Sequence, residues 1–385
     1  MTPMPIPLPR GPAPAPLFIG SEVYRGSSYG DWHPLRVPRV STVIDLARAL
    51  GWLPRADYRT SPRARPAALT AFHTPDYVAA LERVEAAGWA SEADRERHAL
   101  GTVSNPVFPE MFRRPATGVG GAMLAGALLA QGGVVHQPGG GTHHGMPDRA
   151  NGFCYLNDPV FAILALKAHG ARRVAYVDID AHPCDGVEAA FARDPEVLLI
   201  STHEAGRWPR TGALHDEGVG QVFNLPLPKF SGDDAMALAR DAVILPAVQR
   251  FAPDAVVLQC GADGLREDPQ ARLDFSGHAH LGVLEGLRPL APRLLVQGGG
   301  GYNPWSVGRL WTAIWGRLSG QELPDLLPPE AQAVLTALRF QAGAPSVIPP
   351  PGLIARLLDA PRPGQIEGDL RAGVQHLAGR LRAQV

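Results

Sequence analysis

The sequence predicts an α/β protein, a single domain in which helices flank a central parallel sheet. Short apolar segments alternate with helical patterns over most of the chain. Strands that read as nearly continuous apolar runs are typical of parallel sheets covered on both faces. The 385 residues allow one large domain or two ordinary ones, and no internal repeat or long linker follows residue 17. With 45% hydrophobic and 19% charged residues, the composition is that of an ordinary globular protein.

The individual elements follow in order along the chain. Two helices are expected first, at residues 40–50 and 76–87, where apolar residues recur with helical spacing. An apolar helix near residues 116–130 is too short and too rich in glycine to cross a bilayer, so we expect it in the core. We expect strands at residues 134–138, 174–180, 197–202, 255–261 and 294–301. The intervening helices are expected at residues 160–170, 187–193, 235–251 and 278–291.

The two ends of the chain differ from the part between them. Seven prolines within residues 1–16 predict a disordered tail and interrupt the apolar run that a signal peptide needs. Residues 326–385 carry amphipathic helical patterns. They predict a helical C-terminal extension packed on the domain, with a neighbouring subunit as the alternative surface.

Charge and cysteine content exclude several classes of protein. Lys and Arg number 36 and Asp and Glu 37, a balance that argues against binding to nucleic acid. The three cysteines, Cys154, Cys184 and Cys260, are widely spaced and form no CxxC motif. They predict neither a disulfide framework nor a thiolate metal site, and a reducing cytoplasm suits them. We expect no membrane association, and the sequence does not predict an oligomeric state.

Polar side chains gather directly after the predicted strands. The carboxyl ends of parallel strands meet at one edge of a sheet, where ligands bind. Three acids, Asp178, Asp180 and Asp185, fall within eight residues at and after the end of the second strand. Two adjacent histidines, His143 and His144, follow the first strand. The whole set comprises His143, His144, Asp178, Asp180, His182, Asp185, Ser201, Thr202, Asp263 and Tyr302. This convergence predicts an active site rather than core packing.

Three of these residues predict a catalytic metal site. Asp180 and His182 lie two residues apart, so on an extended segment their side chains face the same way. Asp263 follows another strand and supplies a third ligand. Three nitrogen and oxygen ligands with an open position are typical of a catalytic site, and the absence of thiolates leaves zinc and other divalent metals open.

The remaining groups suit acid–base chemistry beside that metal. Imidazole titrates near neutral pH, so His143 and His144 are candidates for proton transfer. Asp178 and Asp185 are the spare acids that could orient them. Tyr302 follows a tetraglycine turn and could donate a hydrogen bond to a developing oxyanion. Together the residues predict metal-assisted hydrolysis of an amide.

Several longer motifs resemble the histone deacetylase family. They are PGGGTHHGMPDRANGFCYLND from residue 138, YVDIDAHPCDGVEAAF from 176, QCGADGL from 259 and QGGGGYN from 297. The likeness extends over residues 17–325 and is strongest to the bacterial, acetoin-utilisation type. It implies the arginase–deacetylase fold and a deacetylase catalytic domain at residues 17–325. The implied activity is removal of acyl groups, acetyl above all, from lysine side chains of proteins by metal-activated water.

The resemblance also implies a role for each site residue. Asp180, His182 and Asp263 would hold Zn²⁺, or Fe²⁺ in some settings. His143 would pair with Asp178 and His144 with Asp185, and Tyr302 would polarise the scissile carbonyl. Phe153 and Trp208 would line the substrate tunnel over Gly152, and Arg39 would serve an inner cavity that handles the released acetate. A monovalent cation, K⁺ or Na⁺, would bind at Asp178, Asp180, His182, Ser201 and Thr202.

The sequence departs from the family pattern at two positions. Pro183 stands where the family has a second histidine, which puts the route to Asp185 and the cation site in doubt. Ser104 stands where many members have an acid that grips the substrate backbone.

Alternative functions remain open. One is a small-molecule amidohydrolase such as an acetylpolyamine deacetylase, which would favour an acid at the tunnel mouth. Gln270 aligns there, with Glu267 and Asp268 close by. A weakly active acyl-lysine binding module is a lesser alternative. The related dimanganese ureohydrolases need a second Asp-x-Asp, so we expect one transition metal per chain.

The two histidines are expected to differ in pKa. A cation near Asp178 would disfavour the imidazolium form of His143, whereas Asp185 would favour that of His144. We therefore expect the higher pKa at His144.

Overall fold

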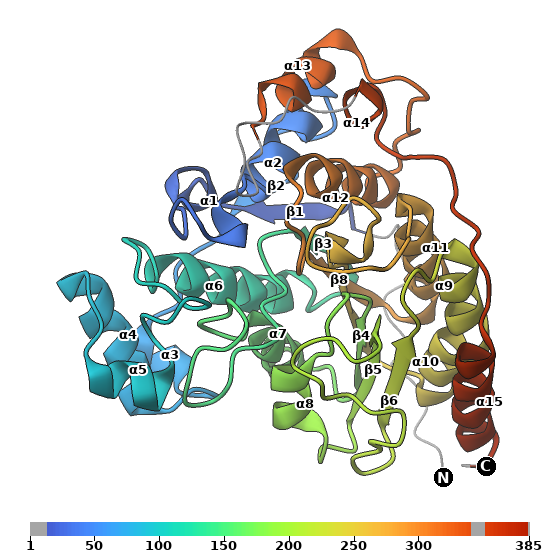
Figure 1. The fold of residues 1–385 in the computed structure, drawn as a ribbon, viewed down its shortest axis with the longest axis horizontal. Coiled ribbons are helices and arrows are strands. Elements are labelled where there is room, and N and C mark those ends of the chain that lie inside the picture. The colour runs from blue at the N-terminus through green and yellow to red at the C-terminus, as the bar shows by residue number, and fades with distance from the viewer. Residues whose placement is uncertain (1–13, 340–350, 384–385) are drawn as a thin grey trace.

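The computed structural model describes residues 14–339 and 351–383. Eight parallel strands form one sheet in the order β2-β1-β3-β8-β7-β4-β5-β6, as predicted for an α/β fold with a central parallel sheet (Figure 1). The strands are β1 (Leu17–Gly20), β2 (Tyr58–Thr60), β3 (Gly133–Gln137), β4 (Val174–Asp178), β5 (Val197–Glu204), β6 (Val222–Leu227), β7 (Ala255–Gln259) and β8 (Arg293–Gln297).

Fifteen α-helices are assigned within the described residues. The N-terminal half contains α1 (Val23–Gly26), α2 (Val40–Ala49), α3 (Pro66–Leu69), α4 (Pro75–Ala87), α5 (Glu92–His98), α6 (Arg113–Leu128), α7 (Asp158–Ala168) and α8 (Asp185–Phe191). The C-terminal half contains α9 (Asp233–Ala239), α10 (Leu245–Phe251), α11 (Gly277–Leu287), α12 (Pro304–Leu318), α13 (Pro329–Ala337), α14 (Pro351–Ala355) and α15 (Gly368–Ala383). None of these helices is long and apolar enough to span a membrane.

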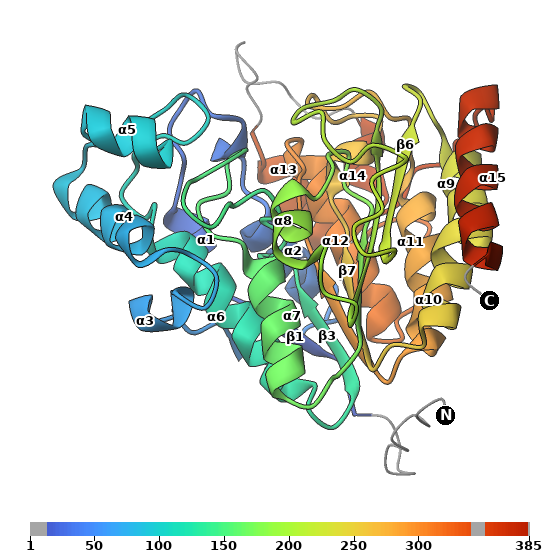
Figure 2. The same ribbon diagram turned by 90° about the horizontal axis from the view of Figure 1, so that it is seen from below.

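Alternate residues of each central strand face opposite layers of helices. In β4, Ala175 and Val177 belong to the core beneath α2 and α9–α12, whereas Val174 and Tyr176 belong to the core beneath α6, α7 and α8. Figure 2 shows α7 and α8 on one side of the sheet and α11 and α12 on the other. Burial on both faces explains why these strands read as continuous apolar runs.

The five strands expected from the sequence, β3, β8, β7, β4 and β5, are contiguous in the sheet. The sequence analysis missed the outer strands β1, β2 and β6. β2 has only three residues, and β6 contains Asn224 and Pro226, which have low strand propensity. Proline is tolerated in β6 because β6 hydrogen-bonds to β5 alone.

The helix expected at residues 235–251 is interrupted. A π-helical turn over Arg240–Ile244 separates α9 from α10, which begins at Leu245 just before Pro246. Proline has no N–H to continue the helical bonding, and the wider turn accommodates it.

The C-terminal segment carries the helices α13, α14 and α15. The last of them, drawn in red, lies along β6 at the edge of the sheet (Figures 1 and 2). Arg309 of α12 is 2% exposed and its guanidinium bonds both carboxylate oxygens of Asp359, at 2.8 and 3.3 Å. Most of the proline-rich tail expected at residues 1–16 lies outside the described residues.

Candidate active site

The predicted polar residues meet at the carboxyl edge of the sheet, beyond β3, β8, β7, β4 and β5. Asp178 is the last residue of β4, and Asp180 and His182 follow in the next turn. Asp263 lies in a 3₁₀ turn after β7, and Tyr302 follows β8. The topology therefore brings together side chains that are up to 159 residues apart in sequence, from His143 to Tyr302.

Asp180, His182 and Asp263 form one buried cluster. Each offers a ligand atom within 4.8 Å of the other two. Nδ1 of His182 lies 3.1 Å from Oδ1 of Asp180 and 2.9 Å from Oδ2 of Asp263. Burial disfavours the imidazolium form, but hydrogen bonds to the two carboxylates outweigh burial and raise the pKa of His182 to about 10. A site that holds a proton so strongly between two buried carboxylates suits a cation.

Glycines shape the space around these ligands. A Cβ atom on Gly261 would lie 2.1 Å from Oδ2 of Asp180, and one on Gly300 would lie 2.0 Å from Oδ2 of Asp263. The Gly300 N–H donates to Asp180 Oδ2 at 2.6 Å. Only glycine allows the backbone to approach so closely. The donor set and its cradle fit a divalent metal with an open position.

Each site histidine has its own carboxylate partner, as the sequence predicts. Nδ1 of His143 lies 2.7 Å from Asp178 Oδ2, and Nδ1 of His144 lies 2.6 Å from Asp185 Oδ1. The two Nε2 atoms lie 3.0 Å apart. Pro183 does not displace Asp185, so the doubt raised by that substitution is removed for the His144 partner.

Without a metal or a monovalent cation, the protein's own charges place the two pKa values in the opposite order to the one expected with those cations bound. Burial disfavours both imidazolium forms. The carboxylates of Asp178 and Asp180 outweigh burial at His143 and raise its pKa to about 9. At His144, burial and then repulsion from His143 lower the pKa to about 4, although Asp185 opposes them. The higher pKa expected at His144 depends on cations bound near Asp178, so it stays a prediction for the metal-loaded protein.

Tyr302 faces the same site and remains protonated. Burial and then the charge of Asp263 raise its pKa well above the usual value for tyrosine, so the hydroxyl keeps its proton to donate. The backbone N–H of Tyr302 donates to Asp268 Oδ2 at 2.6 Å. Asn303 Nδ2 donates to the Glu267 carbonyl at 3.1 Å. These two bonds fix the tyrosine to the loop that carries Asp263.

Aromatic side chains line the approach to the site. The Trp208 ring lies 4.8 Å from the His144 ring, and the Phe153 ring lies 5.9 Å from that of Tyr302. A Cβ atom on Gly152 would lie 2.3 Å from the indole, so glycine permits this packing. These groups bound an outer cavity of ≈ 210 Å³, lined by Ser104, His144, Gly152, Phe153, His182, Arg207, Trp208, Gln270 and Tyr302.

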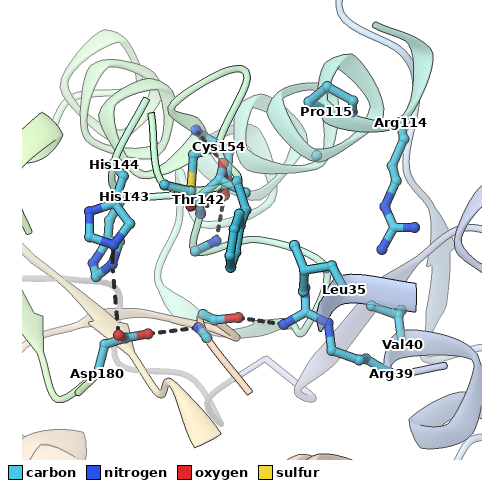
Figure 3. Close-up of a pocket in the computed structure, with 18 of the residues that line it drawn as sticks. Leu35, Arg39, Val40, Arg114, Pro115, Thr142, His143, His144, Cys154 and Asp180 are labelled. Carbon is cyan, nitrogen blue, oxygen red and sulfur yellow. Dashed lines mark hydrogen bonds and ion pairs between the residues drawn. The ribbon is translucent and has the colours of Figure 1, made fainter. Parts of the chain in front are cut away.

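A second cavity of ≈ 50 Å³ extends inward from the two histidines. Figure 3 shows Arg39 and Arg114 on one side of it and His143, His144 and Asp180 on the other. Nη1 of Arg39 donates to the Gly299 carbonyl at 2.7 Å, and burial and Arg114 lower its pKa. Two guanidinium groups in one cavity favour an anionic occupant.

Ser201 and Thr202 lie in the second half of β5, where Ser201 pairs with Asp178 at the end of β4. Ser201 Oγ lies 2.9 Å from Nδ1 of His203. Thr202 Oγ1 is buried and has no hydrogen-bond partner among the described residues. The monovalent cation site expected here therefore stays a prediction.

Several residues at the site were missed by the sequence analysis. The Tyr176 hydroxyl lies 2.6 Å from both Asp178 Oδ2 and Gln259 Oε1. Asn151 Nδ2 donates to Asp185 Oδ2 at 2.9 Å. Asp268 was named only as an acid near the tunnel mouth, and the bond that it accepts from the backbone N–H of Tyr302 was not expected. Tyr176 lies within an apolar run, where an aromatic residue predicts core packing. Only the position of Gln259 at the carboxyl end of a strand gave a usable signal.

Comparison with known proteins identifies the family to which the chain belongs. Residues 33–318 match the model of the histone deacetylase domain. The chain belongs to the histone deacetylase family. It is 34% identical over 332 residues to the acetoin utilization protein AcuC of Bacillus subtilis, covering 82% of this chain and 84% of that protein. It is 31% identical over 308 residues to human histone deacetylase 1, covering 78% of this chain and 64% of that protein.

Solved structures from the histone deacetylase family show the same fold. The crystal structure of an HDAC homolog from Aquifex aeolicus superposes with a TM-score of 0.90 at 31% identity, covering 95% of this chain and all of that one. An HDAC homolog complexed with SAHA superposes equally well. Family membership supports a hydrolase with deacetylase activity and confirms the resemblance seen in the sequence.

Proposed function

We propose that the protein is a metal-dependent hydrolase that removes acyl groups, acetyl above all, from lysine side chains of proteins. One observation carries the proposal. A buried Asp–His–Asp cluster, two His–Asp pairs and a protonated tyrosine converge at the base of a cavity with aromatic walls. Each class of group serves amide hydrolysis, and the family match supports deacetylation.

Asp180, His182 and Asp263 would hold the metal, which we propose is Zn²⁺, with Fe²⁺ as the alternative. When bound there, a divalent cation supplies Lewis acidity and lowers the pKa of water. A monovalent cation, K⁺ or Na⁺, would be held by Asp178, Asp180, His182, Ser201 and Thr202. The buried Oγ1 of Thr202, which has no partner among the described residues, supports this proposal.

The histidine pair would move the protons of the reaction. Asp178 and Asp185 accept from the two Nδ1 atoms, which directs both Nε2 atoms toward the cavity and toward each other. One Nε2 would accept a proton from the attacking water. The departing amine needs a proton, and the same pair would supply it.

The Tyr302 hydroxyl would donate a hydrogen bond to the carbonyl oxygen of the substrate. Charge grows on that oxygen as the carbonyl is attacked, so the hydrogen bond strengthens in the transition state. Burial of Tyr302 and its anchoring by Asp268 keep the donor protonated and in place.

The outer cavity suits the apolar stem of an acyl-lysine. Phe153 and Trp208 offer ring faces, and neither Ser104 nor Gln270 carries the negative charge that an acetylated polyamine would favour. Arg39 and Arg114 make the inner cavity suitable for the acetate product. SAHA, which is bound in a structurally similar HDAC homolog, is expected to compete with acyl-lysine substrates in the outer cavity.

The decisive experiment measures hydrolysis of acyl-lysine peptides and acetylated polyamines by the purified protein with one equivalent of Zn²⁺. We expect turnover of acetyl-lysine peptides. Tyr302→Phe should lower kcat roughly 10²–10³-fold and change KM much less, because the hydroxyl acts mainly in the transition state.

Tyr58→Phe is the matched control, because it removes a hydroxyl from β2, away from the cavities lined by the site residues. It should leave kcat unchanged. An active Tyr302→Phe protein would contradict the oxyanion role. Preference for acetylated polyamines would favour the small-molecule amidohydrolase, and metal-loaded protein that binds but never cleaves would favour the binding module.

A further inference from the structure

We infer that Arg207 makes the mouth of the tunnel selective for acyl-lysines that lie beside carboxylates, and unfavourable to polycationic acetylated amines. The inference rests on the proposed function and specifies its substrate class.

Arg207 gives the outer cavity its charge. Apart from His144 and His182 at the base, the residues that line the cavity with Arg207 carry no ionisable acid or base other than the buried hydroxyl of Tyr302. The ion-pair partner of Arg207 is Glu204, whose side chain is 1% exposed and does not line the cavity. The positive end of the pair therefore faces the substrate and the negative end faces the interior.

The guanidinium is fixed rather than free to swing away. Its Nη2 donates to Glu204 Oε1 at 2.8 Å, and its Nη1 donates to the carbonyl oxygen of Gln270 across the cavity wall. The second oxygen of Glu204 accepts from the Arg272 N–H at 2.6 Å, so Glu204 is itself anchored. A side chain held at both ends loses little further entropy when a ligand binds.

The side chain of Arg207 is 21% exposed, so its guanidinium reaches the cavity. Its Nε is buried and has no hydrogen-bond partner among the described residues, so it lies out of reach of a substrate. The donors that a substrate carboxylate meets are the N–H groups of Nη1 and Nη2 that Gln270 and Glu204 do not use. Guanidinium groups suit carboxylates because several N–H donors lie in one plane.

The acids nearby do not cancel this charge. Glu267 is paired with Arg362 at 2.9 Å. Asp268 is buried, and both of its oxygens accept backbone N–H groups, from Gln270 and Tyr302. Burial, followed by repulsion from Asp263, raises the pKa of Asp268 to about 8. Neither acid therefore offers an acetylated polyamine a free carboxylate.

The test compares three acetyl-lysine peptides that differ only in the residue next to the acetyl-lysine, which is Asp, Asn or Lys. The wild-type protein with Zn²⁺ should prefer the Asp peptide over the Lys peptide by about three- to tenfold in kcat/KM, as expected for one partly screened charge contact. The ratio should shrink as salt is added, because the contact lies at a solvent-accessible mouth.

Two variants test whether Arg207 causes the preference for the Asp peptide over the Lys peptide. The double variant Glu204→Gln/Arg207→Gln removes the ion pair without leaving a buried carboxylate unpaired, and its Asp-to-Lys ratio should fall to about one. Arg210→Gln removes an arginine from the same loop, at an exposed residue that does not line the cavity, and should keep the wild-type ratio.

The outcomes separate the inference from the proposed function. Equal kcat/KM for all three peptides in an active wild-type protein would overturn the inference and leave the proposed function standing. An unchanged ratio in the double variant, or its loss in Arg210→Gln, would also overturn it. Absence of hydrolysis for every acyl-lysine peptide would overturn the proposed function itself.

Discussion

The Nε2 atoms of His143 and His144 lie 3.0 Å apart, so the two imidazoles compete for one proton. A hydrogen bond between them requires one nitrogen to donate and the other to accept. Asp178 and Asp180 direct the charge to His143, which in turn lowers the pKa of His144. A metal at Asp180 would oppose this preference, because added positive charge disfavours the imidazolium form.

We predict that, in the metal-free protein, His143 titrates near pH 9 and His144 near pH 4. Asp178→Asn should lower the pKa of His143, since it removes the nearest carboxylate. The pKa of His144 should then rise, since the repelling imidazolium is lost. Titration of isotope-labelled histidines by NMR measures both shifts. If Asp178→Asn left the His144 pKa unchanged, the coupling through Nε2 would be wrong.

Among the elements, α6 and α7 show how closely the helices beside the sheet are packed. A Cβ atom on Gly126 of α6 would lie 2.6 Å from Cβ of Ala165 and 2.8 Å from its backbone carbon in α7. The two helices flank the segment between β3 and α7, which carries His143, His144 and Gly152. Close contact between helix backbones thus supports a loop that contributes to the site.

We predict that Gly126→Ala lowers the free energy of unfolding by about 1–3 kcal/mol, because the added methyl overpacks the α6–α7 contact. Gly379→Ala is the matched control within α15, where a Cβ would meet no atom within 4 Å. It should stabilise the protein by about 0.4–1 kcal/mol, since alanine loses less backbone entropy in a helix. Urea denaturation of both variants measures the two changes. Stabilisation by Gly126→Ala would show that the helices are not in close contact there.

At the scale of the whole molecule, the proposed metal site joins adjacent strands. Asp180 and His182 follow β4 and Asp263 follows β7, and these strands pair directly in the sheet. Buried carboxylates that lack a cation repel one another. A cation that binds the folded state and not the unfolded state raises the free energy of unfolding.

We predict one divalent transition metal per chain and a melting temperature that depends on it. A metal concentration a hundredfold above Kd adds roughly 2.7 kcal/mol to the free energy of unfolding. This gain raises the melting temperature by a few degrees. Asp263→Ala or His182→Ala should abolish both the metal content and the thermal shift. Asp45→Ala removes a half-buried acid that is paired with Arg25, outside the proposed metal site, and should change neither. Elemental analysis and thermal unfolding with and without a chelator provide the measurements. Two tightly bound manganese ions per chain would contradict the prediction.

The sequence by itself determined the centre of the fold and the composition of the site. The strands that were predicted are the five contiguous central ones, which read as apolar runs, whereas β6 is interrupted by Asn224 and Pro226. The residues placed at their carboxyl ends, from His143 to Tyr302, followed from the rule that parallel strands end together. The family motifs added roles to those residues, and the match to the histone deacetylase model confirmed the family.

Only the tertiary structure decided the properties that depend on distances between segments. The order of the two histidine pKa values follows from contacts among His143, His144, Asp178 and Asp180, which lie in separate segments of the chain. The anchoring of Tyr302 by Asp268 and the clamp from Arg207 to Gln270 join loops that carry no shared motif. The outer strands β1, β2 and β6 form because neighbouring strands offer them hydrogen bonds, a condition that local propensity does not encode. Patterns of neighbouring residues in the sequence indicate which strands are buried and where they end. The interactions between charged side chains and the bonds that hold the site residues in place arise only when distant segments meet.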